Sequence, residues 1–344
     1  MTADQQPLIE SPGGPTPKWA AALDTRAARR VDVKRLLMSN ALLFGIVALI
    51  CYFGVAGSNF LTTGNFIDIL RTSATTIVVA VPITFLLIAG KVDLSIGSTV
   101  ALGAVLTGVL MTQHHVAPLP ASLIGVGAGA LVGTVNGVLC TTLRLSPIIV
   151  TLGMLTAVRG VTLAIAPNPV FGFGEGFDAF GTTNLIGVPW LVWVAALVVA
   201  VGTVVLAMTP FGRHIFAIGN NEEAAYLSGI RSHRAVFIVF VATGAAAGLA
   251  GVMFAAQLDS APSGSLGVGF ELTVLTAVLL GGVAFNGGRG SIHGGVLGVL
   301  FLVILQNGLT IVNAPTATGS IISGCVLVFA AGLDRAKTSG GSRT

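Results

Sequence analysis

The stretch that decides the fold is residues 235–257, AVFIVFVATGAAAGLAGVMFAAQ. It contains no charged residue over 23 positions. About 20 apolar residues are enough for a helix to cross the hydrocarbon core of a bilayer. Its glycines, between Gly244 and Gly251, favour close packing between helices in lipid, because small residues let two backbones approach. We therefore predict a membrane-crossing helix that packs tightly against its neighbours.

The composition extends this interpretation to the whole chain of 344 residues. Hydrophobic residues make up 54% and charged residues only 9%, whereas soluble domains average about 25% charged residues. So few charges cannot cover a water-facing surface, which excludes a soluble enzyme and a nucleic-acid-binding domain. Cys51, Cys140 and Cys325 are isolated within apolar stretches, so neither a disulfide framework nor a metal site is expected.

Ten apolar stretches follow the N-terminal tail, and we predict an all-α polytopic membrane protein with about ten transmembrane helices. The last three stretches are short and tightly linked, so that end of the chain could contain a re-entrant element instead of full crossings. The approximate bounds of the ten stretches are 36–56, 73–90, 95–112, 119–141, 147–166, 186–208, 235–257, 271–285, 293–312 and 315–333.

Lysine and arginine indicate the orientation, because cytoplasmic loops of membrane proteins collect them. With the N-terminus inside, 15 of the 17 Lys and Arg fall in cytoplasmic segments, while Arg71 lies in an outer loop and Arg159 within a span. Both termini are therefore predicted to be cytoplasmic. The chain divides into a tail (1–35), a transmembrane domain (36–333) and a second tail (334–344). The first tail could form a basic interfacial helix or stay disordered.

The longest predicted inside loop, residues 209–234, contains the first of three motifs. We predict one short helix in it, with Asn220 as the N-cap, Glu223 reaching back as in a capping box and Gly229 as a left-handed terminator. A helix of about eight residues is marginal in water and needs something to dock against. Docking on the protein's own loops and docking in a partner's groove both agree with the residues.

The second motif lies at residues 89–98, where the third apolar stretch begins. Asp93 or Ser95 is expected to cap the incoming helix, and Gly97 is expected to permit close contact. An acidic residue beside lipid also fits a proton relay. A capping role is favoured, because Asp93 lies at a predicted cytoplasmic boundary.

The third motif, residues 281–292, is rich in glycine and includes Gly288, Arg289 and Gly290. Such glycines could mimic a phosphate-binding loop, but no GxxxxGK[ST] sequence occurs in the chain. A tight inside turn between two packed helices is therefore the favoured interpretation.

Together with TLGMLTAVRG at residues 151–160, these motifs resemble the permease subunits of bacterial ABC sugar importers. The branch they resemble comprises the ribose, xylose, arabinose and galactoside permeases. The resemblance covers about residues 36–333, with the motifs in the same order and spacing. Lys91 departs from the pattern, because the family commonly has a second glycine at that position.

The resemblance implies a transmembrane subunit that is not an enzyme and binds no cofactor of its own. A second permease copy would complete a pair in the bacterial cytoplasmic (inner) membrane. A cytoplasmic subunit would bind and hydrolyse ATP–Mg, and an extracytoplasmic sugar-binding protein would deliver a monosaccharide (a pentose, a hexose or a related polyol). Transport would then proceed by alternating access at the interface of the two permeases.

The resemblance also implies a role for the loop 209–234. The helix of residues 220–229 would match the coupling helix that docks on the ATPase subunit. The residues expected to shape or contact that coupling site are Arg213, Gly219, Asn220, Glu222, Glu223, Ala224, Ala225 and Gly229.

Several polar residues within the spans have two interpretations. Arg159 is expected to have a structural role, by snorkelling or by bonding to a neighbouring helix, rather than to contact substrate. Asn136 and Asn307 could join helices. Alternatively, with Gln257 and Gln306, they could line a polar path for a sugar.

Two other classes of protein remain as alternatives. An ion-coupled secondary transporter or channel for a small polar solute usually carries intramembrane acids, and these spans hold almost none, with Glu271 at a predicted outer boundary. An intramembrane enzyme would need a nucleophile–base pair or a metal set, and none is evident in the sequence. The outer loop of residues 167–189 is long enough to meet a partner at the outer mouth.

Overall fold

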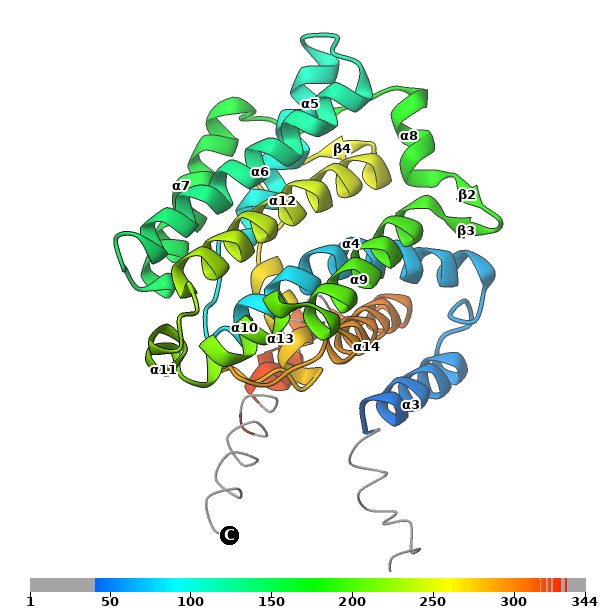
Figure 1. The fold of residues 1–344 in the computed structure, drawn as a ribbon. Helices are drawn as coiled ribbons and strands as arrows, with labels where there is room; N and C mark the ends of the chain where they lie inside the picture. The colour runs from blue at the N-terminus through cyan, green and yellow to red at the C-terminus, as the bar shows by residue number, and fades with distance from the viewer. Residues whose placement is uncertain (1–40, 316, 320, 323, 329–331, 333–344) are drawn as a thin grey trace, which may run out of the picture.

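The computed structural model describes residues 41–315, 317–319, 321, 322, 324–328 and 332. These residues form mostly helices (Figure 1), which agrees with the all-α prediction. The predictions for the tails 1–35 and 334–344 lie outside the described residues. The helices of the bundle are α3 (Ala41–Ala56), α4 (Thr63–Ile88), α5 (Ile96–Thr112), α6 (Pro118–Thr141), α7 (Pro147–Ile165), α9 (Trp190–Met208), α10 (Pro210–Asn220), α11 (Glu222–Leu227), α12 (Ser232–Leu258), α13 (Phe270–Leu280) and α14 (Ile292–Ile311).

Within this described part of the chain, six helices are long and apolar enough to cross a membrane. They are α4, α6, α7, α9, α12 and α14. The other four predicted stretches correspond to shorter apolar helices, namely α3, α5, α13 and residues 317–328. The chain is therefore a helical integral membrane protein, and the count of ten crossings stays a prediction.

Helix α13 is too short to cross the bilayer. Its 11 residues rise about 16 Å, roughly half of the hydrocarbon thickness. The chain reaches its first residue, Phe270, from α12 through residues 259–269, which form a short strand and turns. This arrangement is the one expected of a segment that enters the membrane without a full helical crossing.

Helix α4 begins at Thr63, well before the apolar stretch that starts at residue 73. Thr62 is its N-cap, and the Thr62 side chain accepts a hydrogen bond from a backbone amide of the first turn. Because this part of α4 contains polar residues, hydropathy alone did not predict the first ten residues of the helix. Arg71 lies within α4, with its Nη1 atom 3.7 Å from Oδ1 of Asp68, so its predicted place in an outer loop is wrong.

Helix α12 lies next to α6 and α5 in the middle of the bundle (Figure 1). A Cβ atom on Gly129 of α6 would collide with the backbone of Gly244 and Gly248 of α12. A Cβ atom on Gly103 of α5 would lie 2.6 Å from the Gly248 carbonyl oxygen. We call Gly103, Gly129, Gly133, Gly244 and Gly248 the glycine seam. The close packing predicted for the glycine-rich stretch is therefore confirmed.

At the other end of the bundle from α10 and α11, short elements cover the end of α12 (Figure 1). Strand β1 pairs antiparallel with β4, and β2 pairs antiparallel with β3. A Cβ atom on Gly181 of α8 would collide with the backbone of Ala256 in α12, so α8 lies directly against that helix. These elements are β1 (Val170–Phe171), α8 (Glu175–Thr182), β2 (Asn184–Leu185), β3 (Val188–Pro189) and β4 (Ser260–Ala261).

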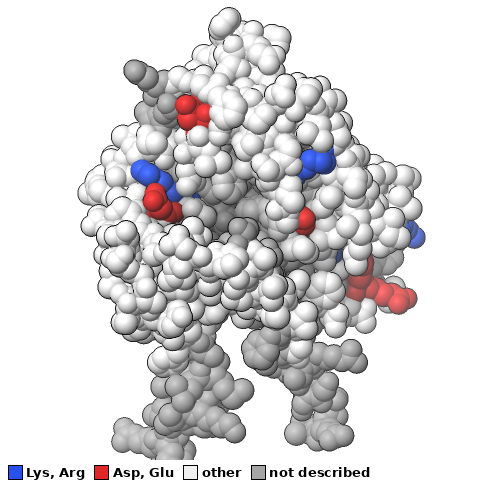
Figure 2. All heavy atoms as spheres, turned by 180° about the vertical axis from the view of Figure 1, so that it is seen from behind, with Lys and Arg blue, Asp and Glu red and all other residues white. Residues whose placement is uncertain are grey.

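Helices α7 and α9 differ sharply from α4 in burial. In the most apolar 18-residue segment of α4, 83% of the residues are buried. In the corresponding segments of α7 and α9, 22% of the residues are buried. Their exposed side chains are apolar, for example Ile149 and Leu197. Figure 2 shows a face of the molecule on which charged side chains are few and scattered. Such surfaces suit contact with lipid or with another apolar helix.

Candidate functional site

The end of the molecule that carries α10 and α11 brings the three sequence motifs together. The Gly288 amide, in the turn before α14, donates a hydrogen bond of 2.8 Å to the carbonyl oxygen of Ile88 at the end of α4. A Cβ atom on Gly219 of α10 would collide with that carbonyl oxygen and lie 2.6 Å from the Gly288 nitrogen. We call Ile88, Gly219 and Gly288 the glycine joint. Three segments that are far apart in sequence therefore meet through their backbones.

The loop 209–234 contains two helices where the sequence predicts one. Thr209 caps α10, because its side chain accepts a hydrogen bond from the Gly212 amide. The apolar face of α10 is held in the bundle by Ile215 and Ile218, which are buried. A bend after α10 then redirects the chain into the much shorter α11.

Asn221 is the N-cap of α11, and its Oδ1 atom accepts the Ala224 amide at 2.9 Å. The prediction that Asn220 has this role is wrong by one residue, because Asn220 completes α10 and donates to the Phe216 carbonyl oxygen. The capping box predicted for Glu223 is wrong for the same reason. The third position after the true cap is Ala224, which has no carboxylate.

The predicted end of α11 is confirmed. Gly229 has a φ of +84°, the left-handed conformation that a glycine adopts without strain. The Ile230 amide then donates to the Ala225 carbonyl oxygen at 3.0 Å, which satisfies a carbonyl of the last turn. A helix of only six residues is thus closed at both ends.

The side chains of α11 divide into one that packs inward and several that face outward. Ala225 is 4% exposed, whereas Tyr226 and Leu227 are 65% and 79% exposed. Glu222 and Glu223 are exposed as well. The helix therefore rests on the protein through a small residue and presents two large apolar side chains and two carboxylates. That surface is available to another protein.

An ion pair joins α11 to the second motif. The Nζ atom of Lys91 lies 2.9 Å from Oε2 of Glu222. The two side chains are partly exposed, so the pair is worth up to about 1 kcal/mol. The sequence does not predict this contact, because the two residues are 131 positions apart. The one signal in the sequence was that Lys91 departs from the pattern of the family that the chain resembles.

Asp93 is buried at the centre of a small polar network. Its Oδ1 atom accepts hydrogen bonds from the Ser95 amide at 2.8 Å and from the Ser95 hydroxyl at 2.7 Å. Ser95 stands at the N-cap of α5 but makes no capping bond with its side chain. The Asn136 amide group, from α6, donates to Ser95 Oγ at 2.9 Å and to Asp93 Oδ2 at 3.3 Å. The network thus attaches the segment that precedes α5 to helix α6.

Arg159 bonds to a turn of the chain rather than to a helix. Its Nη1 atom donates to the carbonyl oxygens of Ser263 and Leu266, at 3.0 and 2.8 Å. Close by, a Cβ atom on Gly97 would collide with the Gly267 backbone and with the Glu271 carboxylate. The close approach predicted for Gly97 is therefore confirmed. The contacts of Arg159 agree with the structural role that the sequence favours.

Residues 281–292 form a tight turn between α13 and α14, as predicted. The Ala284 amide donates to the Arg289 carbonyl oxygen at 2.9 Å, which closes the turn. Ser291 then caps α14 by accepting the Gly294 amide. Gly288 and Gly290 have φ values of +76° and +159°. Glycine at 288 therefore permits both the left-handed backbone and the close approach to α10, where a Cβ atom would lie 2.6 Å from Oδ1 of Asn220.

A cavity of about 660 Å³ lies beside the start of α13 and the end of α14. No Asp, Glu, Lys or Arg occurs among the described residues that line it. Its lining includes Gln306, one of the four residues that the sequence suggests for a polar path. The other polar residues of the lining are Thr273, Thr276, Thr310 and Asn313.

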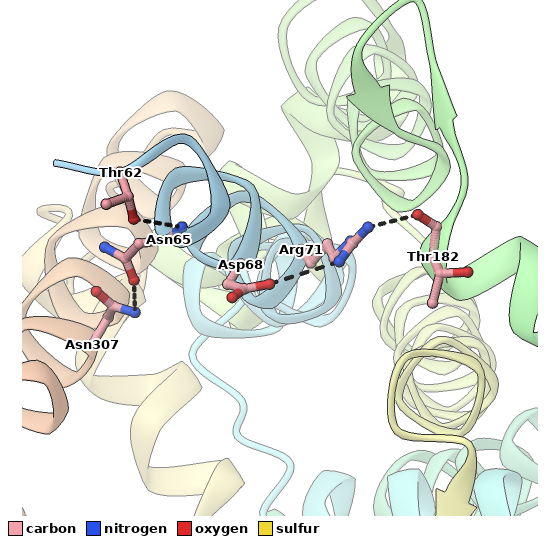
Figure 3. A network of polar contacts seen from close by, with 6 residues as sticks. All are labelled: Thr62, Asn65, Asp68, Arg71, Thr182 and Asn307. Carbon is pink, nitrogen blue, oxygen red and sulfur yellow. Dashed lines mark hydrogen bonds and ion pairs between the residues drawn. The ribbon is translucent and has the colours of Figure 1, made fainter. Parts of the chain in front are cut away.

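The remaining path candidates lie elsewhere. Asn136 is fully buried and belongs to the Asp93 network. Asn307 donates to Oδ1 of Asn65 at 2.8 Å and so joins α14 to α4 (Figure 3). Gln257 lies in the last turn of α12 and does not line the cavity. For Asn136 and Asn307 these contacts agree with the helix-joining interpretation.

Figure 3 also shows how α4 contacts α8. Arg71 points away from Asn307 and donates to the carbonyl oxygen of Thr182 at 2.6 Å. Thr182 is the last residue of α8. The outer segment of residues 167–189, which the sequence suggests could meet a partner, is thus bonded to α4 through Arg71. Hydropathy alone had assigned Arg71 to a loop.

The fold and these contacts define an integral membrane protein whose buried motifs converge on a short exposed helix. Residues 65–331 match the model of a family described as branched-chain amino acid transport system / permease component. The chain therefore belongs to this family of permeases. The resemblance to ABC sugar permeases is confirmed by the relatives with which the chain aligns.

Three relatives illustrate this. The ribose import permease protein RbsC of Escherichia coli strain K12 is 35% identical over 319 residues, which cover 91% of this chain and 98% of that protein. The D-allose transport system permease protein AlsC of the same strain is 34% identical over 294 residues, covering 85% and 90%. The L-arabinose ABC transporter permease protein AraH of Azospirillum brasilense is 34% identical over 336 residues, covering 97% of each. No solved structure matches the chain.

Proposed function

We propose that this chain is the transmembrane permease subunit of an ATP-driven importer in the bacterial cytoplasmic membrane. Its cargo is a monosaccharide, either a pentose, a hexose or a related polyol. The observation that carries the proposal is α11, a closed helix that rests on Ala225 and exposes Tyr226 and Leu227. The printed names of the relatives, which are ribose, allose and arabinose permeases, support the class of cargo.

In this proposal, α11 is the coupling helix. A separate ATPase subunit binds ATP–Mg and moves α11, while the chain itself catalyses nothing. The Lys91–Glu222 ion pair and the glycine joint connect α11 and α10 to the end of α4. Backbone contacts at glycine leave no flexible side chain to absorb a displacement. Movement of α11 is therefore passed to the bundle.

From the end of α4, the route continues through residues 91–95. Asp93 and Ser95 bond to Asn136, which lies in the same helix as the seam glycines Gly129 and Gly133. The helices of the glycine seam then move together, because their backbones are in direct contact. This route assigns Asp93, Ser95 and Asn136 to the transmission of movement rather than to a proton relay.

The cavity beside α13 is the proposed part of the sugar path within one copy. Sugar hydroxyls need hydrogen-bonding partners and tolerate few charges. The hydroxyls of Thr273 and Thr276 and the amide of Gln306 supply such partners. A second copy of the chain completes the path, and alternating access takes place at the interface of the two permeases. An extracytoplasmic sugar-binding protein docks on the outer segment of residues 167–189.

Reconstitution tests the proposal. We expect the chain to copurify with its ATPase subunit from detergent extracts. In proteoliposomes that also contain the sugar-binding protein, we expect uptake of a pentose, hexose or polyol that depends on ATP. If the chain alone moved sugar along an ion gradient, it would instead be a secondary transporter and the proposal would be overturned.

A pair of variants tests the coupling helix itself. Tyr226→Ala together with Leu227→Ala removes the exposed apolar side chains of α11 and is expected to abolish copurification of the ATPase. Leu119→Ala is the matched control, because Leu119 is 70% exposed in the first turn of α6, at the opposite end of that helix from Thr141, which lines the same cavity as Glu222 of α11. Thermal unfolding in detergent should be the same for both variants. Retained ATPase binding in the double variant would exclude the docking role of α11.

A further inference from the structure

A second cavity lies where the turn between α6 and α7 meets α11 and the start of α12. Its volume is about 390 Å³, an order of magnitude above the roughly 30 Å³ that one water molecule occupies. Lys91, Arg144, Glu222 and His233 contribute to its lining. They come from four separate segments of the chain, so the cavity is a product of the fold rather than of one basic stretch.

The charges around this cavity do not balance. Glu222 is the one acidic residue of the described lining, and it is paired with Lys91 at 2.9 Å. Arg144 and His233 have no ion-pair partner among the described residues. Positive charge is therefore left over in a concave site, which favours an anionic ligand.

The backbone at Arg144 turns the chain from α6 towards α7. Its φ is +56°, in the left-handed region that a residue with a side chain seldom adopts. This conformation closes the end of α6, because the Leu145 amide donates to the Leu139 carbonyl oxygen at 3.2 Å. The same turn places Arg144 in the lining of the cavity.

The residues around the cavity indicate which class of anion it binds. Leu143 and Leu145, on either side of Arg144, are 59% and 48% exposed. On α7, directly after the cavity, Ile148 and Ile149 are 45% and 72% exposed. An apolar surface thus begins where the basic cavity ends. A soluble anion has no use for that surface, whereas a phospholipid needs a cationic site for its headgroup and an apolar surface for its acyl chains.

We propose that this cavity binds the phosphate headgroup of an anionic phospholipid, whose acyl chains lie along α7. Arg144 and His233 contact the phosphate, and Lys91 adds a second positive charge from the side that faces Glu222. The lipid thus sits directly beside α11. The site is independent of the cargo and of the cavity beside α13.

Native mass spectrometry of the full chain in detergent tests the proposal. The probes are phosphatidylglycerol and phosphatidylcholine with identical acyl chains. We expect the wild-type chain to retain phosphatidylglycerol in preference to phosphatidylcholine. Arg144→Gln together with His233→Gln should lose that preference, with a fall of about fivefold in affinity from the arginine charge removed.

Matched variants make the result specific. Arg234→Gln removes a charge from the first turn of α12 without touching the cavity lining, so it should bind phosphatidylglycerol as the wild type does. Arg144→Lys keeps the charge and should retain most of the preference, which guards against a double variant that fails to fold. Equal retention of phosphatidylglycerol by the wild type and the Arg144→Gln/His233→Gln variant would overturn the proposal.

Two further arms separate lipid from other anions. If millimolar inorganic phosphate displaces phosphatidylglycerol from the wild-type chain, the site binds free phosphate and the lipid proposal is overturned. If the double variant keeps its lipid but loses the ATPase subunit, the cavity receives an acidic side chain of that protein and the lipid proposal is again overturned. Lipid loss with unchanged ATPase binding supports it.

Discussion

Two groups of glycines bring backbones into contact. One is the glycine seam of α5, α6 and α12, and the other is the glycine joint at the ends of α4 and α10. The two groups differ in backbone conformation. The glycines of the seam lie within regular helices, and none of them has a positive φ. In the joint, Gly288 has a φ of +76° and Gly219 stands at the end of a helix, one residue before its last. The seam holds helices together along their length, whereas the joint brings the ends of α4 and α10 and the turn before α14 together at one point.

This difference separates two kinds of sensitivity. The seam is surrounded by buried helix, so a new side chain there has nowhere to go and must push whole helices apart. The joint lies at an end of the bundle, where a turn and a short helix can shift. We therefore expect substitutions in the seam to reduce stability and substitutions in the joint to reduce coupling.

The largest effect is expected for Gly129→Leu. A leucine at this position would have to displace the backbone of α12 at Gly244 and Gly248, and such overpacking costs about 3 kcal/mol or more. The measurement is the free energy of unfolding in detergent, followed by circular dichroism. Gly127→Leu is the control, because a Cβ atom at Gly127 meets nothing within 4 Å. Equal destabilisation of the two variants would contradict the role of the seam.

A smaller loss of stability but a clear loss of transport is expected for Gly219→Ala. The new Cβ atom would meet the Ile88 carbonyl oxygen, so α10 must move away from α4 at a cost of about 1–3 kcal/mol. ATP-driven uptake in proteoliposomes should fall by about tenfold, which corresponds to 1.4 kcal/mol. Gly153→Ala in α7, where a Cβ atom has free space, should transport normally. Normal uptake by Gly219→Ala would refute the joint as a route of coupling.

Asn136→Leu tests the polar network of Asp93, Ser95 and Asn136, which links the glycine joint to the glycine seam. It removes the amide that bonds to Asp93 and Ser95 and leaves a buried carboxylate short of a donor, at a cost of about 1–3 kcal/mol. Thr134→Val is the comparison, since the Thr134 hydroxyl bonds within its own helix. Unfolding free energies of the two variants report the difference. If Asn136→Leu reduced the free energy of unfolding no more than Thr134→Val, the network would not contribute to stability.

The smallest effect is expected for the Lys91–Glu222 ion pair. A double-mutant cycle with Lys91→Gln and Glu222→Gln should give a coupling energy of about 0.2–1 kcal/mol, because the pair is partly exposed. The coupling should shrink as salt is raised. A coupling energy indistinguishable from zero at low salt would leave the glycine joint, which acts through α10, as the sole connection between α11 and α4 among the contacts described above.

Long apolar stretches and glycine content were sufficient to predict the main apolar helices and the tight packing of α12, but not α8 or α10. Where polar residues interrupt the pattern, prediction failed: α4 starts among Thr63, Asp68 and Arg71, which hydropathy reads as a loop. Local capping chemistry was ambiguous as well. Asn220 and Asn221 are equally good N-caps by residue type, and the choice depends on where α10 ends.

Contacts between distant segments are the part that the sequence could not predict. The pairing of Lys91 with Glu222 and the meeting of Ile88, Gly219 and Gly288 depend on how the helices are arranged in space. The same holds for the polar path. Asn136, Asn307 and Gln306 look alike in sequence, but Asn136 bonds to the segment before α5, Asn307 bonds to α4, and Gln306 lines a cavity.

The contact of Arg159 with residues 262–267 has a consequence for how the protein is made. A non-helical segment at membrane depth has carbonyl groups that lipid cannot satisfy. Arg159 donates to two of them, at Ser263 and Leu266. The ribosome synthesises Arg159 about a hundred residues before these acceptors, so the donor precedes both acceptors during synthesis. Arg159 thus supplies two carbonyl groups of this turn with a hydrogen-bond donor in place of water.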